Sequence, residues 1–216
     1  MSNFKTALLA SALILAAGSA GAANLVVNGG FAGNFAPNGG FTTVGVGSGV
    51  IPAWTVFGGN VDWIHGYWQS SDGDGFSVDM DGTTQGAIGQ YINTVAGQQY
   101  KLTFDMSGNP DAGTDTDYLG VFASGFLSPN ATYSVTGANS HGNMNWSQRS
   151  YTFTANSSST LIGFQSLNQN LCCYGAAIDN VSVSGAVPEP ATWAMMIIGF
   201  GAAGSMIRRR KLATAA

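Results

Sequence analysis

The stretch Tyr100-Lys101-Leu102-Thr103-Phe104-Asp105-Met106 alternates between apolar and polar residues along its whole length. Successive side chains of a β-strand point to opposite faces, so a period of two predicts a strand that is buried on one face only. The stretch Tyr151-Thr152-Phe153-Thr154 repeats the pattern. Both stretches indicate strands of a half-buried sheet.

Shorter apolar runs, separated by turns rich in Gly, Asn and Pro, are predicted to be strands as well. They are Leu25 to Val27, Trp54 to Phe57, Ser77 to Met80, Ala87 to Ile92, Tyr118 to Ala123, Thr132 to Val135, Leu161 to Leu167 and Ala177 to Ser184. Helices favour Glu and Lys on exposed faces, and this part of the chain has almost none. About ten strands of this kind predict a single all-β sandwich.

Both ends of the chain look like processing segments. Lys5, an apolar stretch from Thr6 to Ala17 and the small residues Ala20-Gly21-Ala22 predict a signal peptide over residues 1–22. At the other end, an apolar run from Ala191 to Ile207 is slightly shorter than a membrane requires and is followed by four cations. Because such cations resist crossing a bilayer, the C-terminus is expected to stay cytoplasmic and the preceding chain to lie outside.

The C-terminal pattern resembles the PEP-CTERM sorting signal of Gram-negative bacteria over residues 187–211, with a tail at 212–216. Its matching residues are Val187, Pro188, Glu189, Pro190, Arg208, Arg209 and Arg210. The resemblance implies signal peptidase and an exosortase as processing partners, and membrane contact only through the apolar helix before processing. A secreted protein of the cell surface or extracellular matrix is expected; an ordinary single-pass anchor is the alternative.

The working part, residues 23–186, has the size of one domain. Residues 23–187 hold ten Asp, no Glu and only two cations, Lys101 and Arg149, which gives a formal charge of −8. Nucleic acid is not expected as a partner, because phosphate binding requires clustered Lys and Arg.

Motifs spread over nearly all of this domain resemble the choice-of-anchor C family. They are Asn24 to Asn28 with Phe31, Ile51-Pro52-Ala53-Trp54, Val61-Asp62-Trp63-Ile64, Ser77 to Gly82, Gly86 to Gln90, Tyr100 to Asp105, Gly108-Asn109-Pro110 and Ala177 to Val181. The resemblance implies a galactose-binding-like jelly roll, similar to plant cell-wall proteins, that contacts polysaccharide. It implies no established enzyme activity.

Asp179 is expected to share a face with Val181 and Val183 and so to point inward, where an unpaired charge is costly. The resemblance implies a structural calcium ion between the first and last strands, with Asp179 and the Asn28 region as candidate ligands. Ala32 departs from this pattern, because relatives often carry an acidic residue there. The alternative is an Asp179 that backbone N–H groups satisfy.

Two further acidic clusters are predicted to be solvated turns, since neither has the ligand order or the final Glu of an EF-hand loop. One is Asp72-Gly73-Asp74-Gly75 with Asp79 and Asp81, and the other is Asp111 with Asp115 and Asp117.

Aromatic residues carry the binding hypothesis. Trp63, Tyr67 and Trp68 cluster around His65 and Gly66. A flat ring on an exposed loop can stack on a sugar ring, so these three residues are candidates for binding a neutral glycan. The alternative is that they belong to the core, as is expected for Trp54.

Catalysis has little support in the sequence. His65 and His141 are the only histidines, no zinc-binding spacing or nucleophile elbow occurs, and Glu, the commonest glycosidase acid, is absent from the domain. Cys172 and Cys173 are adjacent, so a strained vicinal disulfide, an intermolecular bridge and free thiols all stay open.

These features predict an exported, exosortase-sorted, non-catalytic protein that binds extracellular polysaccharide, as in a biofilm or capsule matrix. A structural or adhesive protein that makes protein contacts is the first alternative. A glycoside hydrolase is the second.

Overall fold

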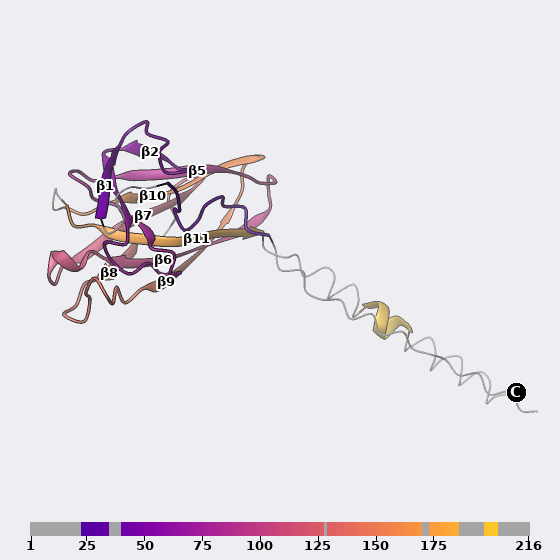
Figure 1. Cartoon of the computed structure of the whole chain (residues 1–216). Coiled ribbons are helices and arrows are strands. Elements are labelled where there is room, and N and C mark those ends of the chain that lie inside the picture. Colours follow the sequence, from indigo (N-terminus) through magenta and orange to yellow (C-terminus); the bar gives the residue numbers. More distant parts are fainter. Residues whose placement is uncertain (1–22, 35–39, 128, 170–172, 186–196, 203–216) are drawn as a thin grey trace, which may run out of the picture.

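A computed structural model of the chain describes residues 23–34, 40–127, 129–169, 173–185 and 197–202 (Figure 1). The predicted signal peptide, the sorting-motif residues at 187–190 and 208–210, and Cys172 lie outside these residues. Residues 197–202 are helical. Within the described ranges, no helix has both the length and the apolar character needed to cross a membrane.

The domain consists almost entirely of strands. In chain order the elements are β1 (Gly40–Gly45), β2 (Thr55–Gly58), β3 (Asn60–His65), β4 (Phe76–Asp79), β5 (Ala87–Asn93), β6 (Gln99–Gly108), the 3-10 helix η1 (Pro110–Ala112), β7 (Thr116–Ala123), β8 (Ala131–Ser134), β9 (Ser147–Thr154), β10 (Ser159–Ser166) and β11 (Ala176–Gly185). The predicted strand from Leu25 to Val27 is wrong, and β1 and β3 were not predicted as strands.

The strands form two antiparallel sheets. The six-stranded sheet has the order β1-β3-β4-β11-β6-β9, and the five-stranded sheet has the order β2-β5-β10-β7-β8. In Figure 1, β5 and β10 of one sheet lie above β11 and β6 of the other. From β4 onward, successive strands generate the orders 4-11-6-9 and 5-10-7-8, which is the topology of a jelly roll. The predicted all-β jelly-roll sandwich is therefore confirmed.

The main core lies between the two sheets. Leu102, Phe104 and Met106 of β6 are fully buried there, whereas Lys101 before them is exposed and Thr103 and Asp105 between them are half-buried, as the alternation predicts. The ring of Phe104 meets that of Phe164 from the opposite sheet edge-to-face, with centroids 4.7 Å apart. The period of two thus places this strand correctly.

β3 was missed because both of its faces are buried. Val61 and Trp63 enter the main core, while Asp62 and Ile64 face the outer side of the six-stranded sheet and are also buried. A strand that is covered on two sides shows no alternation of apolar and polar residues.

The segment around Asn28 closes one edge of the core. The indole N–H of Trp54 donates to the Asn28 carbonyl at 2.8 Å, and that of Trp63 donates to the Phe31 carbonyl at 2.9 Å. Phe31 itself is fully buried. Trp54 is therefore a core residue, as predicted. Trp63 is one too, with 2% of its surface exposed, so it is not an exposed stacking ring.

Asp179 does not share a face with Val181, and this part of the prediction is wrong. A β-bulge interrupts the pairing of β11 with β6 after Asp179, and Asn180 adopts a left-handed φ of 50°. Val181 and Val183 consequently pack in the main core, whereas Asp179 turns to the outer side of the six-stranded sheet. There it is nevertheless fully buried.

Gly29 lets the N-terminal segment approach β11. Its carbonyl accepts the Val181 N–H at 2.9 Å, and a Cβ at this position would collide with the Val181 carbonyl. We predict that Gly29→Ala lowers the free energy of unfolding by about 2 kcal/mol, because backbone must move to admit the methyl group.

Urea denaturation measures this loss, with Gly49→Ala as the control, since a Cβ at Gly49 meets no described atom within 4 Å. Equal stability of the two variants would contradict the close packing of this segment on β11.

Candidate functional site

A pocket of about 420 Å³ opens on the outer face of the six-stranded sheet. Its floor comes from β1, β3 and β4, where Thr43, Asp62 and Asp79 are neighbours across the strands. Its walls come from the loop after β3, from η1 and from the loop before β11. The lining residues are Phe41, Thr43, Asp62, Ile64, Tyr67, Trp68, Asp79, Gly82, Thr83, Asn109, Asp111, Cys173 and Tyr174.

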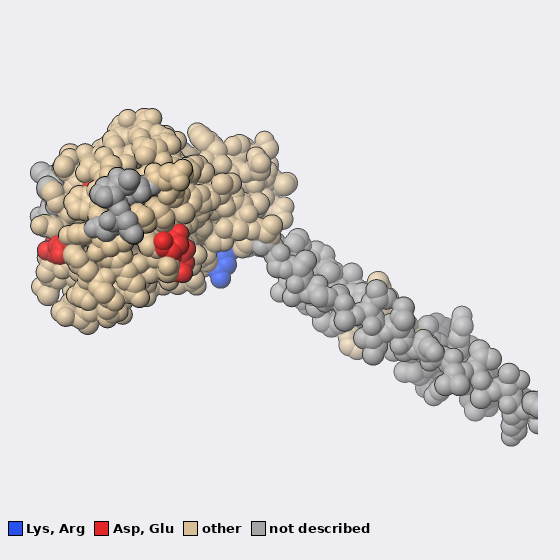
Figure 2. Space-filling view, viewed as in Figure 1, with Lys and Arg blue, Asp and Glu red and all other residues tan. Residues whose placement is uncertain are grey.

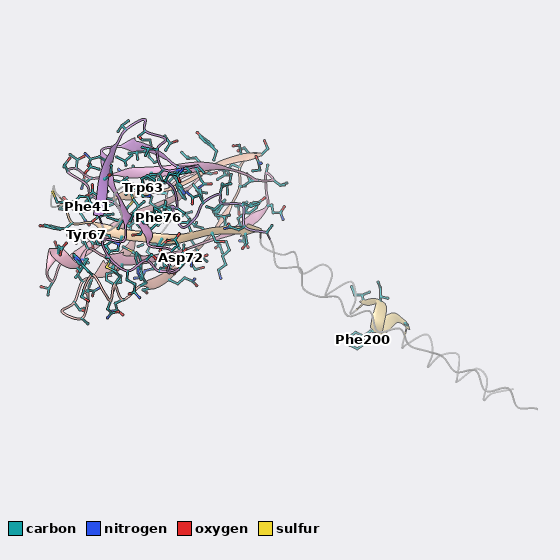
Figure 3. All side chains as sticks on the ribbon, viewed as in Figure 1. Phe41, Trp63, Tyr67, Asp72, Phe76 and Phe200 are labelled. Atoms are coloured by element: carbon teal, nitrogen blue, oxygen red, sulfur yellow. The ribbon has the colours of Figure 1, made fainter. Side chains whose placement is uncertain are left out.

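Aromatic rings form the rim of this pocket. Phe41 is 48% exposed, and its ring meets that of Tyr67 edge-to-face at 5.3 Å (Figure 3). Tyr174, from the loop before β11, is 50% exposed. The rim thus presents apolar rings from three separate segments of the chain to solvent.

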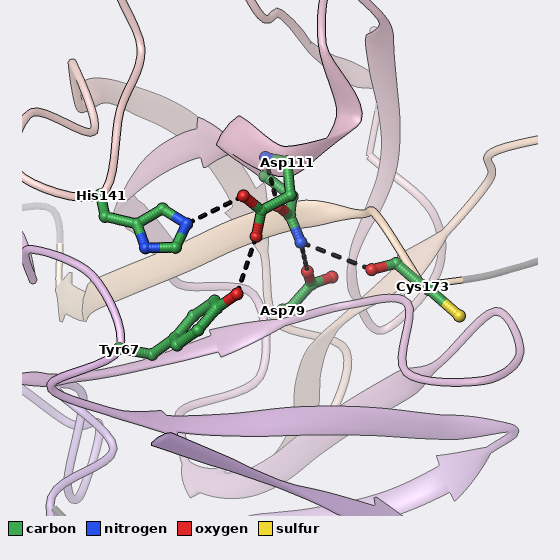
Figure 4. A network of polar contacts seen from close by, with 6 residues as sticks. Tyr67, Asp79, Asp111, His141 and Cys173 are labelled. Atoms are coloured by element: carbon green, nitrogen blue, oxygen red, sulfur yellow. Dashed lines mark hydrogen bonds and ion pairs between the residues drawn. The ribbon is translucent and has the colours of Figure 1, made fainter. Parts of the chain in front are cut away.

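A network of hydrogen bonds fixes Tyr67 (Figure 4). Its hydroxyl donates to Asp111 Oδ2 at 2.9 Å, and Nε2 of His141 lies 2.9 Å from Asp111 Oδ1. The Asp111 N–H donates to Asn109 Oδ1, and Asn109 Nδ2 donates to Asp79 Oδ2 at 2.8 Å. The hydrogen bond to Asp111 raises the pKa of Tyr67, so the hydroxyl stays a donor. The ring is therefore tied to the floor of the pocket.

Two carboxylates lie in the pocket floor. Asp62 is 8% exposed and Asp79 1%, and burial raises the pKa of Asp62 and holds that of Asp79 well above its usual range. The Thr43 hydroxyl donates to Asp62 Oδ1 at 2.6 Å. Asp79 Oδ1 accepts the backbone N–H groups of Asp81 and Gly175. Burial with specific partners in a hollow is typical of a functional site.

Behind this floor, Asn168 bridges two more buried carboxylates. Its Nδ2 donates to Asp81 Oδ2 at 2.9 Å and to Asp117 Oδ1 at 2.8 Å. Burial raises the pKa of Asp117 to about 7. The prediction that Asp79, Asp81 and Asp117 lie in solvated turns is thus wrong, because all three are buried and each accepts at least one backbone or amide N–H group.

A second group of carboxylates surrounds Gly30. A Cβ there would lie 2.8 Å from Asp72 Oδ2, 3.2 Å from Asp74 Oδ2 and 3.9 Å from Asp179 Oδ1. Burial raises the pKa of Asp179 to about 8, although its oxygens accept the N–H groups of Ser71 and Asn180 at 2.7 and 2.6 Å. The absence of a side chain at Gly30 leaves room between these oxygens.

Oxygen donors of this kind suit a hard cation such as calcium. The described residues nevertheless contain no three acidic, His or Cys side chains already arranged as a metal site, so Asp72 and Asp74 would have to close on an ion. Asn28 Nδ2 donates to the carbonyls of Ala32 and Pro52 at 2.9 Å. Calcium binding at Asp179 and the Asn28 region stays a prediction, and Asp72 and Asp74 are further carboxylates close to Asp179.

The structure brings only part of the predicted aromatic cluster to the pocket. Tyr67 and Trp68 line it, whereas Trp63 lies in the main core. Trp68 is 4% exposed, donates to Ser77 Oγ at 2.8 Å and packs in a small cluster with Ile64, so it offers the pocket an edge and not a free face. Binding by Tyr67 and Trp68 stays a prediction.

Most of the lining residues were not singled out as binding residues from the sequence, among them Phe41, Asp62, Asn109, Asp111 and Tyr174. An aromatic residue beside Gly is the signal that marks Phe41, in β1, and Tyr174, in the loop before β11. No local signal marks Asp111, since only the fold brings η1 beside Tyr67. Cys173 is disulfide-bonded, and its backbone carbonyl accepts Asn109 Nδ2 at 3.4 Å.

Residues 24–184 match the family described as "Protein of unknown function (DUF642)", and residues 186–211 match the PEP-CTERM protein-sorting motif. The predicted sorting motif is thereby confirmed. The chain is also 32% identical over 164 residues to Halomucin of Haloquadratum walsbyi. The aligned part is 74% of this chain and only 2% of that relative's length.

Among solved structures, a family 35 carbohydrate-binding module from Clostridium thermocellum is 15% identical, with a TM-score of 0.44; 66% of this chain and 97% of that one are covered. A xylan-binding domain from Paenibacillus barcinonensis is 15% identical, with a TM-score of 0.45 and coverages of 70% and 97%. Structural similarities this weak give no information about the ligand of this chain.

The raised pKa of Asp117 makes stability depend on pH. The unfolded chain releases this proton near pH 3.8 and the folded chain near pH 7, so the folded state binds more protons in between and loses stability as the pH rises. In Asp117→Asn, the side-chain oxygen can still accept the hydrogen bond from Asn168 Nδ2, but the amide has no proton to release in this pH range. We predict that the variant gains stability relative to wild type between pH 4 and 7, by at most about 4 kcal/mol.

Urea denaturation at a series of pH values measures this difference, and Asp115→Asn, at an exposed neighbouring position, is the control. A difference between Asp117→Asn and wild type that does not change with pH would contradict the assignment.

Proposed function

The chain belongs to the DUF642 family, whose description assigns no activity, and from the geometry of the pocket we propose that it is an exported, non-catalytic protein that binds extracellular polysaccharide. The observation that carries the proposal is that exposed and half-buried aromatic rings line the same pocket as polar groups held in place by hydrogen bonds. The rings are Phe41, Tyr67 and Tyr174, and the polar groups belong to Asp62, Asn109 and Asp111.

This combination matches the two faces of a sugar. The C–H groups of a pyranose ring form an apolar face that packs on aromatic rings, while its hydroxyls donate to carboxylates and amide oxygens. The volume of about 420 Å³ lies within the range of small-ligand sites. The openness of the rim at Phe41 and Tyr174 allows a longer chain to pass through the site.

The contacts of the carboxylates favour binding over hydrolysis. A glycosidase needs two carboxyl groups that are free to transfer protons or attack the sugar. Asp62 and Asp79 are neighbours across β3 and β4, but both oxygens of Asp79 are engaged by N–H donors. Asp79 therefore serves as an anchor for Asn109 and the loop before β11.

The sorting motif supports export and gives the proposal its place in the cell. We propose that signal peptidase removes residues 1–22 and that an exosortase acts at the motif, after brief anchoring through the apolar segment. The product is then a protein of the cell surface or extracellular matrix, for example in a biofilm of a Gram-negative bacterium. We further propose that the chain belongs to the choice-of-anchor C family.

A second candidate function is supported by a different face. On the outer side of the five-stranded sheet, Phe122 lies edge-to-face with Phe57 at 5.5 Å and with Phe126 at 5.9 Å. Phe57 is 44% exposed and Phe126 64%. Rings set at such angles present no flat platform for a sugar, but they suit an apolar protein partner. This face favours the structural or adhesive alternative.

We also propose a structural calcium ion at Asp72, Asp74 and Asp179. A cation there would offset the mutual repulsion of these carboxylates and lower the pKa of Asp179. Millimolar calcium should raise the melting temperature of wild type measured at pH 8, and EDTA should reverse the rise.

The matched variant is Gly30→Ala, whose methyl group would occupy the space between the three carboxylates. It should abolish the response to calcium. A melting temperature of wild type that ignores calcium and EDTA would refute the site.

Binding at the pocket should depend on Tyr67. We predict that Tyr67→Ala weakens binding to the exopolysaccharide of the producing cell by about tenfold. The variant lacks the aromatic ring that the hydrogen bond to Asp111 holds in place for stacking on the sugar. Co-sedimentation of the purified protein with the polysaccharide measures the change.

Tyr91→Ala is the matched control, because Tyr91 is 73% exposed on the five-stranded sheet, away from the pocket. Loss of binding in the Tyr91 variant with normal binding in the Tyr67 variant would place the site elsewhere.

A further inference from the structure

The pocket concentrates negative charge without any cation of its own. Asp62, Asp79 and Asp111 line it, and no Lys or Arg is among the residues that form it. Residues 23–187 contain only Lys101 and Arg149, and the face drawn in Figure 2 is correspondingly poor in charged side chains. Arg149 donates to Ser147 Oγ and the Thr132 carbonyl, away from the pocket.

His141 contacts one of these carboxylates in the part of the chain that the structure describes. Its Nε2 lies 2.9 Å from Asp111 Oδ1, and its side chain is 42% exposed. The other titratable groups that face the pocket are Tyr67 and Tyr174. Asp62 lies on the floor of the pocket and Asp111 in its wall, so His141 contacts the wall.

Asp62 has an oxygen without a donor. Oδ1 accepts the Thr43 hydroxyl at 2.6 Å, and no described residue donates to Oδ2. Oδ2 is therefore the oxygen of this carboxylate that is open to a ligand in the pocket. A charged N–H donor of the ligand would bind it well, because hydrogen bonds to a charged donor are roughly twice as strong as neutral ones.

The rim reinforces a preference for positive charge. Phe41, which is exposed, and Tyr67, which is half-buried, line the pocket together with these carboxylates, and the faces of aromatic rings attract cations. A uronic acid would bring its own carboxylate within reach of Asp62 and Asp111 and be repelled. Three carboxylates and the aromatic rings of the pocket thus favour a ligand that carries a positive charge.

We propose that the pocket recognises a polysaccharide unit that carries a free ammonium group, namely an amino sugar without an N-acetyl group, and that Asp62 and Asp111 select it. This inference rests on the proposed polysaccharide-binding function and names its ligand class. The ammonium group lies between the two carboxylates, and the sugar ring packs on Phe41 and Tyr67.

Calorimetric titration of the full-length chain tests the proposal, in a polyoxyethylene detergent that has no sugar headgroup. The three probes are a β-1,4-linked glucosamine tetramer, the same tetramer fully N-acetylated, and a tetragalacturonate. The glucosamine tetramer is expected to bind at least about tenfold more tightly than its N-acetylated form, and the galacturonate not at all.

Asp62→Asn should abolish that preference, because it should lower the affinity for the glucosamine tetramer more than the affinity for the N-acetylated tetramer. Asp115→Asn removes the same charge from an exposed position outside the pocket and should retain the preference. Asp111→Asn, at the exposed wall of the pocket, repeats the test at a position that contributes less to folding. Thermal melting of each variant verifies that it is folded.

The outcomes separate the inference from the proposed function. Equal affinity of wild type for the two glucosamine-based tetramers, or tighter binding of the galacturonate, would overturn the inference and leave polysaccharide binding intact. If Asp62→Asn and Asp115→Asn reduced the preference for the glucosamine tetramer equally, the net negative charge of the domain alone would account for the attraction. That result would also overturn the inference. If wild type bound none of the three probes and also failed to bind the polysaccharide of the producing cell, the proposed function itself would be overturned.

Discussion

Carboxylates buried without cations are the constraint that shapes this domain. Asp62, Asp79, Asp81, Asp117 and Asp179 are all at most 8% exposed, and among the described residues none of them pairs with Lys or Arg. A buried charge is tolerated only when hydrogen bonds replace its water. N–H groups from distant segments therefore converge on these oxygens: Asn109 and Gly175 on Asp79, Asn168 on Asp81 and Asp117, and Ser71 on Asp179.

The same contacts build the pocket. By holding Asn109, Asp79 positions η1, and η1 in turn places Asp111 where it receives the Tyr67 hydroxyl. By holding Gly175, Asp79 also fixes the loop that carries Tyr174. The exposed rings at the rim thus depend on a carboxylate that no ligand needs to touch. What is left open to a ligand is Oδ2 of Asp62, the exposed side of Asp111 and the ring surfaces. This arrangement favours a sugar with donor groups, and most of all one with a positive charge.

The sequence predicts those parts of the structure that depend on local pattern. The alternation from Tyr100 to Met106 predicted β6 because that strand is buried on one face only. The inward orientation of Asp179 failed because a single bulge at Asn180 reverses the alternation, and no residue type announces a bulge unambiguously. Trp63 and Trp68 were candidate sugar-stacking rings because aromatic residues serve cores and binding sites alike. Asp79, Asp81 and Asp117 lie in stretches typical of solvated turns. Their burial depends on Asn109, Gly175 and Asn168, which are remote in the chain, so only the fold reveals it.

Two faces of the sandwich compete for the role of binding surface, and a map of ligand-induced NMR chemical-shift changes distinguishes them most directly. With isotope-labelled protein and fragments of the producing cell's polysaccharide, the account predicts saturable shifts centred on Phe41, Tyr67, Asn109 and Tyr174, which line the pocket. Shifts confined to Phe57, Phe122 and Phe126 on the five-stranded sheet, or no shifts at saturating polysaccharide, would contradict it.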